Sequence, residues 1–311
     1  MAGLMGAEVL GAKLLEAIFP AEVKNGRNRR SGFLSGCGAL ASAVLGLGVS
    51  QAHAQESDIN LQPAVTEVMS EIHGFHDFLL WIIIPISLLV LLLLVWVMVF
   101  FNRRANATPK TFTHNMTVEV IWTVIPVLIL VAIAWKSFPI LFKEEQIPQS
   151  ELTLKVIGNS WNWTYEYPDM DVSFTSVPLS EEDALAQGRP YLLAVDQPLY
   201  VPEDTTVEVL VTSSGVIHSF AVPAFGVKED AIQGRVNTSW FRVDSDRLGD
   251  QRTFYGQCSE LCGIDHSFMP IEIRVVSRQE FNEWVEQQGG TPTLAAAPSN
   301  QLAAHASAAA R

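Results

Sequence analysis

An apolar run from Phe78 to Phe101 extends over 24 residues without a charged side chain. At about 1.5 Å of rise per residue, a helix of this length measures roughly 36 Å, enough to cross a hydrocarbon core of about 30 Å with some tilt. Uncharged runs of this length seldom occur in the cores of soluble proteins, so a buried core helix is the weaker interpretation. The run therefore predicts a membrane-spanning helix.

A second apolar run extends from Val118 to Phe142, with Glu119 near its start and Lys136 near its end. Together the two runs predict a transmembrane helical hairpin over residues 78–142. The loop between them contains two arginines and a lysine but no acidic residue, and loops of this composition stay in the cytoplasm. We therefore expect the segments before and after the hairpin on the opposite, outer face of the membrane.

The N-terminal segment has the pattern of a secretory leader. Three arginines precede an apolar run of small residues and an Ala-His-Ala motif that ends at Ala54, which is typical of a signal peptide and its cleavage site. We expect residues 1–54 to be removed, leaving Gln55 at the mature N-terminus and an outer segment over residues 55–77. Lipidation at Cys37 is an alternative, although the lipoprotein-type box there opens the apolar run instead of following it.

The C-terminal part is strongly acidic. Residues 143–290 carry 24 acidic and 10 basic side chains, a net charge of −14, against −13 for the whole chain. A surface of this charge repels phosphate backbones, so we expect no nucleic-acid partner. Its sequence consists of short stretches rich in β-branched and aromatic residues, separated by Gly, Pro, Asn and Asp and without alternating amphipathic helices. This pattern predicts an antiparallel all-β barrel or sandwich over residues 143–288.

The expected elements of this domain follow from the same pattern. A terminal helix over Arg278–Gln288 presents Phe281 and Trp284 to the sheets, and from residue 289 to residue 311 we expect a disordered, alanine-rich tail. The expected strands are Leu152–Ile157, Trp161–Tyr167, Thr205–Thr212, Ile217–Val222, Ser239–Val243, Arg252–Gln257 and Met269–Val276.

The residues best suited to metal chemistry gather in CSELCGIDHSFM, which contains Cys258, Cys262, His266 and Met269, with His218 forty residues before Cys258. Thiols, imidazoles and a thioether select copper or zinc over magnesium or calcium. One Cys, two His and an axial Met make a mononuclear blue-copper site, so the second Cys is one ligand too many for it. Two thiolates can instead bridge two copper ions, each with one imidazole and one weak axial ligand.

Two other interpretations of these residues stay open. A disulfide between Cys258 and Cys262 suits an oxidising compartment, and a structural zinc site uses two Cys and two His. Neither gives a role to Met269, because a thioether is no zinc ligand. Neither explains the membrane anchor or the acidic surface.

The two spans, the aromatic segment WNWTYEY (Trp161–Tyr167) and the C-x-E-x-C-G-x-x-H-x-x-M run resemble subunit II of haem–copper cytochrome c oxidases, over residues 60–288. The resemblance implies a cupredoxin-like domain with a binuclear copper (CuA) centre. It implies a subunit of a proton-pumping cytochrome c oxidase in a bacterial inner membrane, with its C-terminal domain in the periplasm. Such a subunit accepts electrons from a basic cytochrome c and relays them to subunit I, where oxygen is reduced to water, and it contacts the other oxidase subunits.

Position by position, the resemblance implies the metal ligands. Cys258 and Cys262 bridge both copper ions. The side chain of Glu260 matches a family residue that helps to hold a magnesium ion at the contact with subunit I. The other copper ligands are His218 and Met269 at one ion, and His266 with the backbone carbonyl of Glu260 at the other.

The resemblance also implies one residue for electron transfer and one for proton transfer. Trp161 matches the tryptophan at which the electron enters, and Glu119 matches the carboxylate at the mouth of a proton path into subunit I. From the residues alone, Glu119 needs no functional role, because the helix dipole favours a carboxylate near a helix N-terminus. The family usually has His-Gln before the aromatic segment and Tyr between its tryptophans, whereas this chain has Asn159, Ser160 and Asn162. Because the copper ligands are intact, we expect this departure to affect only details of the docking surface.

The acidic outer face and the aromatic segment lead to a docking hypothesis. A net negative charge attracts a lysine-rich cytochrome c and raises its association rate. Strand alternation puts the four aromatic residues from Trp161 to Tyr167 on one face, of which we expect three in the core and Trp161 at the rim. The candidate docking acids are Glu166, Asp169, Asp171, Glu203, Asp204, Glu229 and Asp230.

Three rival functions share some of these features. Subunit II of a quinol oxidase has the hairpin and the barrel but no copper, and the full ligand set argues against it. A soluble-type copper domain, such as that of nitrous oxide reductase, lacks the two spans. A copper-delivery or redox-sensing membrane protein would use the cysteine pair but would need neither Met269 nor the aromatic segment.

Overall fold

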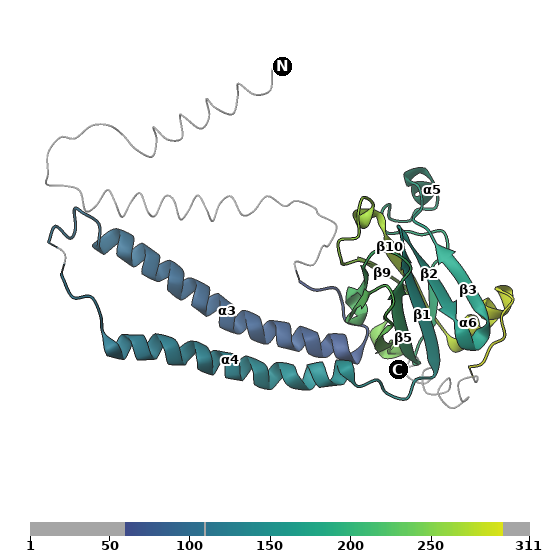
Figure 1. Ribbon diagram of the computed structural model, residues 1–311, viewed down its shortest axis with the longest axis horizontal. Helices are drawn as coiled ribbons and strands as arrows, with labels where there is room; N and C mark the ends of the chain where they lie inside the picture. Colours follow the sequence, from purple (N-terminus) through teal and green to yellow (C-terminus); the bar gives the residue numbers. More distant parts are fainter. Residues whose placement is uncertain (1–59, 109, 295–311) are drawn as a thin grey trace, which may run out of the picture. The chain divides into compact units, whose positions relative to one another are not determined.

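The computed structural model describes residues 60–108 and 110–294 (Figure 1). The expected leader over residues 1–54, with Ala54 and Cys37, lies outside this part of the chain. Two long helices come first and two β-sheets follow. The predicted order, a helical hairpin followed by an all-β domain, is confirmed.

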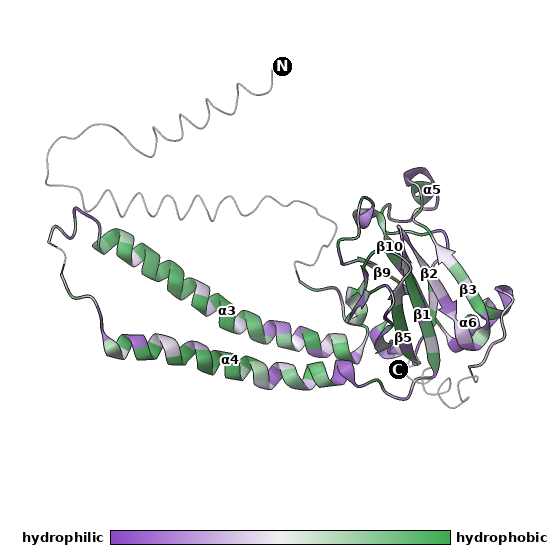
Figure 2. Ribbon diagram, viewed as in Figure 1, coloured by the Kyte–Doolittle hydropathy of each residue, from purple (hydrophilic) through white to green (hydrophobic). Residues whose placement is uncertain are grey.

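The hairpin consists of α3 (Glu67–Phe100) and α4 (Met116–Glu145). Both helices are long and apolar enough to cross a membrane. Apolar residues make up most of their length (Figure 2), and most of these side chains are exposed. In water such a surface would be strongly unfavourable, whereas lipid chains cover it without cost. A lipid environment therefore accounts for both the length of these helices and the exposure of their apolar side chains.

Helix α3 begins well before Phe78, inside the segment 55–77 that the sequence assigns to an extramembrane stretch. Its N-cap is Thr66, whose hydroxyl accepts a hydrogen bond from the Met69 backbone N–H, an arrangement that stabilises a helix start. The first turns contain Glu67 and Glu71. These charged residues lie outside the apolar run, so the run alone does not predict that the helix includes them. Both carboxylates pair with Lys143 near the end of α4, at 2.8 and 2.7 Å.

The β domain consists of two five-stranded sheets. One has the order β3-β2-β1-β5-β8 and the other β4-β10-β9-β6-β7. A short helix α5 (Glu181–Ala186) follows β3, and α6 (Arg278–Gln287) follows the last strand. The strands are β1 (Leu152–Asn159), β2 (Asn162–Tyr167), β3 (Val172–Ser176), β4 (Leu199–Pro202), β5 (Thr206–Ser213), β6 (His218–Val222), β7 (Val227–Ala231), β8 (Asn237–Arg242), β9 (Thr253–Cys258) and β10 (Pro270–Val276).

The expectation of a purely antiparallel domain is wrong for two strand pairs. β1 pairs with β5 in parallel, and β4 pairs with β10 in parallel. Each parallel pair joins strands that are far apart in sequence, and a local pattern of alternating residues carries no information about such pairing. Strands β3, β4 and β7 were not predicted at all. They are four or five residues long and lie at sheet edges.

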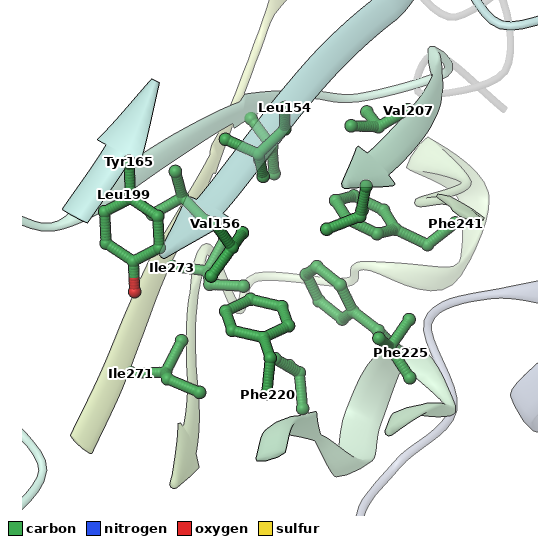
Figure 3. Close-up of a cluster of buried hydrophobic side chains, with 14 of the residues drawn as sticks. Leu154, Val156, Tyr165, Leu199, Val207, Phe220, Phe225, Phe241, Ile271 and Ile273 are labelled. Atoms are coloured by element: carbon green, nitrogen blue, oxygen red, sulfur yellow. The ribbon is translucent and has the colours of Figure 1, made fainter. Parts of the chain in front are cut away.

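The core lies between the two sheets, where side chains from both inner faces meet (Figure 3). Val156 of β1 and Tyr165 of β2 face Phe220 of β6 and Ile271 of β10, and all four are fully buried. In β1 and β2 every second side chain is buried, which is the period that a strand packed on one face requires. Burial of these large side chains holds the two sheets together.

The end of the described chain differs from the expected disordered tail. Leu294 is buried, and its carbonyl oxygen accepts a hydrogen bond from the Asn282 side chain. The Thr291 backbone N–H donates to the Met170 carbonyl oxygen at 3.0 Å. Residues 289–294 therefore pack on the domain, so the ordered part extends past residue 288. The prediction of a disordered tail from residue 289 rested on composition alone, and composition does not show that residues 289–294 pack on the domain.

A buried ion pair fastens the segment after α5 to the outer face of β10. Glu272 is 1% exposed and accepts from the Arg189 guanidinium and, at 3.1 Å, from the Val195 backbone N–H. Arg274 Nε also lies 3.6 Å from Glu272 Oε1, so removing Arg189 leaves the buried carboxylate with this longer contact and the Val195 N–H. We expect Arg189→Met to lower the free energy of unfolding of the full chain in detergent by about 3 kcal/mol, the lower end of the range for a broken buried ion pair, measured by urea denaturation.

Two further variants check this prediction. Arg189→Met combined with Glu272→Gln removes both charges and keeps an acceptor for Val195, so it should recover most of the lost stability. Lys155→Met removes one partner of the partly exposed Lys155–Glu166 pair, whose N–O distance is 2.8 Å, and should cost about 1 kcal/mol or less. An equal loss in Arg189→Met and Lys155→Met would contradict the role of the buried pair.

Candidate metal centre

Three neighbouring strands bring the candidate ligands together. β6 begins at His218, β9 ends at Cys258, and β10 begins immediately after Met269. Phe220 on β6 pairs with Cys258 on β9, and β9 pairs with β10. The Cys258 backbone N–H donates to the Met269 carbonyl oxygen at 3.1 Å, which closes the loop that carries the remaining residues.

The sulfur atoms and the imidazoles form a compact group. Cys258 Sγ and Cys262 Sγ are 3.7 Å apart. Each sulfur has its own imidazole: His218 Nδ1 lies 3.8 Å from Cys258 Sγ, and His266 Nδ1 lies 3.5 Å from Cys262 Sγ. The carbonyl oxygen of Glu260 is 3.4 Å from Cys258 Sγ. Two thiols thus form the middle of the site, with one imidazole on each.

The environment of the site is apolar and largely closed to water. His218 is fully buried, and both cysteines and Met269 are nearly so. Burial, and secondarily the charge of His266, lowers the pKa of His218 and keeps its imidazole neutral. Burial, with the Cys258 thiol beside it, raises the pKa of the Cys262 thiol to about 12. A metal ion must therefore displace that proton when it binds.

These residues suit soft or borderline metal ions. His218, Cys258 and Cys262 have ligand atoms within 4.8 Å of one another. Both thiols are free, and 3.7 Å is well beyond the disulfide bond length of about 2.05 Å, so the structure has no disulfide here. A thiol pair with an imidazole on either side is the donor set that two bridged copper ions need. Zinc alone would leave the buried Met269 without a role.

The structure places the other predicted metal residues at the same loop with different exposure. His266 lies in the 3-10 helix η4 (His266–Phe268) and is half-buried. Glu260 is exposed, so its carbonyl oxygen faces Cys258 while its carboxylate remains accessible from outside the domain.

Trp161 lies directly against the metal centre. It occupies the turn before β2 and is partly buried at the edge of the core, whereas Trp163, Tyr165 and Tyr167 are fully buried. Its indole Nε1–H donates to the carbonyl oxygen of Cys262 at 3.0 Å. The indole ring also packs on Gly263, whose φ of +118° and close approach to the ring exclude a side chain there.

Glu119 is not brought to this centre. It lies in the first turn of α4, where one carboxylate oxygen accepts from the Asn115 backbone N–H at 3.3 Å. The Asn115 side chain in turn accepts from the N–H groups of Thr117 and Val118. Glu119 thus has a capping contact of the ordinary kind.

Comparison with protein families assigns both parts of the chain. Residues 54–140 match the model of the cytochrome c oxidase subunit II transmembrane domain, and residues 152–276 match the model of its periplasmic domain. The two matches together include well over half of the sequence. The chain belongs to the cytochrome c oxidase subunit II family. It is therefore a subunit of cytochrome c oxidase, and the family implies copper in its periplasmic, cupredoxin-like domain.

Individual relatives agree with this assignment. A probable cytochrome c oxidase subunit 2 of Rickettsia bellii (strain RML369-C) is 51% identical over 228 residues, which are 73% of this chain and 82% of the relative. Cytochrome c oxidase subunit 2 of Cereibacter sphaeroides is 39% identical over 293 residues, 86% and 95% of the two chains. The crystal structure of the periplasmic domain of subunit II of cytochrome oxidase of Bradyrhizobium japonicum has 46% identity and a TM-score of 0.41, and the match covers 46% of this chain and 97% of that one.

Sequence reasoning missed the residues that surround the ligands. A Cβ atom on Gly158 would lie 2.7 Å from His218 Cδ2, so the imidazole packs directly on the backbone of β1. Asn159 and Ser214 join that strand to the loop before His218. None of these has metal-binding chemistry, so a search for ligand types does not find them. The available signal was the departure from the family pattern at Asn159.

Proposed function

We propose that this subunit accepts electrons from cytochrome c at a binuclear copper centre and relays them to subunit I, where oxygen is reduced to water. The single observation that carries the proposal is the pair of free thiols, 3.7 Å apart, each with an imidazole at its outer side. Two copper ions held by these ligands would supply a one-electron carrier that reorganises little on reduction. Haem-type oxygen chemistry belongs to the partner subunit.

The ligand assignment follows the family resemblance, and the arrangement of the two sulfurs and two imidazoles supports it. Cys258 and Cys262 would be shared by both ions. His218 and Met269 would hold one ion, and His266 with the carbonyl oxygen of Glu260 would hold the other. The exposed Glu260 carboxylate supports a magnesium site at the contact with subunit I. The strand framework, not the metal, sets the positions of the buried ligands, which lowers the cost of reorganisation.

Electron entry at Trp161 is supported by its contact with the ligand loop. The hydrogen bond from the indole to the Cys262 carbonyl links the ring to a bridging ligand in one step. The ring is partly exposed, so a donor docked on the surface can approach it. The other aromatic residues of the segment are buried and serve as core.

The acidic surface supports docking of a basic cytochrome c. Of the candidate acids, Asp169, Asp171 and Asp230 are exposed. Glu166 pairs with Lys155 and Asp204 lies 3.7 Å from Arg242, which reduces their attraction for a partner. Helix α5 adds three consecutive exposed acids, at positions 181 to 183, which are not among the candidate docking acids named from the sequence. The net charge raises the rate of encounter more than the final affinity.

The membrane arrangement completes the proposal. We place the hairpin in the bacterial inner membrane, the loop with its three basic residues in the cytoplasm, and the copper domain in the periplasm, according to the distribution of positive charge. Subunit I and the other oxidase subunits would cover part of the apolar hairpin surface. A quinol oxidase subunit has no need of the thiol and imidazole set, which argues against that rival.

Rapid mixing of the assembled oxidase with reduced cytochrome c tests the proposal. We expect the copper absorbance to change before that of the haem groups, with one electron taken up by each copper centre. The second-order rate should fall as ionic strength rises, because salt screens the attraction between the acidic face and the donor. Haem reduction without prior reduction of copper would contradict the relay, and zinc in place of copper would contradict the centre itself.

A separate prediction concerns Glu119. If its carboxylate starts a proton path, Glu119→Ala should slow steady-state turnover of the assembled oxidase severalfold and leave the copper spectrum unchanged. Glu119→Gln keeps an acceptor for the Asn115 N–H and so preserves the capping contact. Slow turnover in both variants indicates proton transfer, whereas normal turnover in Glu119→Gln would reduce Glu119 to a helix cap.

A further inference from the structure

The turn between β1 and β2 packs on both halves of the metal centre. On one side, the imidazole of His218 lies against the backbone of Gly158, and its ring centroid is 5.9 Å from that of Trp163. On the other side, Trp161 donates to the carbonyl oxygen of Cys262. Residues 158–163 therefore contact a histidine ligand and a cysteine ligand at once, through side chains and backbone within a single turn.

Asn159 joins this turn to the loop that leads into His218. The Ser214 hydroxyl donates to Asn159 Oδ1 at 2.7 Å, and Ser214 is only four residues before His218. The Ser214 backbone N–H donates to the Gly158 carbonyl oxygen at 3.0 Å. The Ser214 hydroxyl also lies 3.4 Å from the Gly158 carbonyl oxygen. The side chains of residues 214–217 are exposed, so Ser214 is the residue through which this loop bonds to β1.

The other end of the Asn159 amide fastens the turn itself. Asn159 Nδ2 donates to Asn162 Oδ1 at 3.0 Å and to Thr164 Oγ1 at 2.9 Å. Thr164 Oγ1 also lies 3.0 Å from Thr175 Oγ1 on β3. Asn162 and Thr164 stand on either side of Trp163 in the chain, and Trp161 precedes them. The amide thus uses both donor and acceptor functions, a combination that neither a carboxylate nor an apolar side chain offers.

We propose that Asn159 is a positioning residue that holds the turn of Trp161 and the loop of His218 in a fixed relation. The inference rests on the proposed function, in which these two residues are the electron entry and a copper ligand. Asn159 itself touches neither donor nor metal and acts through Ser214 and the turn. The departure from the family pattern at this position thus bears on the support of the metal centre and not only on the docking surface.

The first test uses the full chain in detergent without metal. Amide hydrogen exchange should be about three- to tenfold faster over residues 214–217 in Asn159→Ala and in Ser214→Ala, because each variant loses the same hydrogen bond. The double variant should be no faster than Ser214→Ala alone, because Ser214→Ala already loses both contacts of the hydroxyl, with Asn159 Oδ1 and with the Gly158 carbonyl oxygen. Ser173→Ala, which removes an exposed hydroxyl on β3, is the matched control and should change nothing. Additive effects in the double variant, or unchanged exchange in the single ones, would overturn the proposal.

The second test uses the copper-loaded oxidase. Asn159→Ala should retain the wild-type copper content but alter the electron paramagnetic resonance spectrum of the centre and slow its reduction by cytochrome c. Asn159→Asp keeps the acceptor for Ser214 and loses both donors, so it should restore slow exchange at residues 214–217 while the spectrum stays closer to wild type than in Asn159→Ala. An unaltered spectrum and rate in Asn159→Ala would refute a positioning role.

The two tests separate the failures of the two proposals. Absence of copper from the wild-type oxidase would overturn the proposed function, while the exchange experiment on the metal-free chain would still measure the bond between Asn159 and Ser214. Should Asn159→Ala fail to fold, Ser214→Ala tests the same bond from an exposed position. Its faster exchange would support the proposal, and wild-type exchange would overturn it.

Discussion

Replacing either Cys258 or Cys262 with serine is expected to abolish the binuclear copper centre of the full-length subunit. Each sulfur lies at the shared edge of the site, 3.7 Å from the other and next to a different imidazole, so loss of one thiolate removes a ligand from both ions. A serine hydroxyl does not replace a soft thiolate. Copper content should fall from two ions per chain toward none, measured by elemental analysis together with the visible spectrum.

Met269→Leu is the informative companion to these variants. Met269 is buried beside the start of β10, and as a weak axial ligand it should tune the copper without holding it. We therefore expect wild-type copper content and a shifted reduction potential. Loss of copper from Met269→Leu and its retention in Cys258→Ser would reverse the assigned roles. One copper per chain in a blue site would contradict the binuclear centre.

Trp161→Gln should slow electron entry from cytochrome c by orders of magnitude while copper content stays normal. The substitution removes the indole ring that bridges the surface and the Cys262 carbonyl, and Trp161 is the one aromatic residue of the segment that is not fully buried. Docking should be unaffected, because no charge changes. The measurement is the second-order rate of reduction by cytochrome c over a range of ionic strengths, in which the slope should match wild type.

Trp240→Gln provides a matched control for the tryptophan prediction. Trp240 also donates its Nε1–H to a backbone carbonyl, that of Lys143, at 3.2 Å, but it lies on β8 and contacts no metal ligand. Its replacement should leave electron entry at the wild-type rate. A normal rate in Trp161→Gln would make Trp161 a packing residue, and an equal loss in both variants would indicate a general effect on folding.

The two helices of the hairpin could be predicted from sequence because each apolar residue adds its own free-energy cost of exposure to water. The sum over one continuous segment is enough to indicate a span. The run from Phe78 to Phe101 needs no partner to be recognised as a span. The start of α3 was less predictable, since its first turns are polar. Contacts with Lys143, far along the chain, and the Thr66 cap stabilise them. Most strand positions were predicted by their composition and alternation, whereas the edge strands β3, β4 and β7, each four or five residues long, were missed.

The ligand types of the metal centre were also readable in the sequence, because only thiols, imidazoles and a thioether have the required softness. Their convergence was implied only by the family resemblance, since physically it depends on β6 lying beside β9 and β9 beside β10. The support from Asn159 was unpredictable for a related reason. An amide is chemically unremarkable until folding places it against Ser214, 55 residues away.

Local composition by itself determined the two apolar helices, the acidic outer domain, the alternating burial of β1 and β2 and the set of candidate ligands, because each depends on the chemistry of neighbouring residues. The tertiary structure alone decided the parallel pairing of β1 with β5, the order of ligands around the two sulfurs, the burial of Glu272 against Arg189 and the link from Asn159 to the loop of His218. All four depend on contacts between segments far apart in the chain, where the free energy of packing, and not local preference, selects the partner.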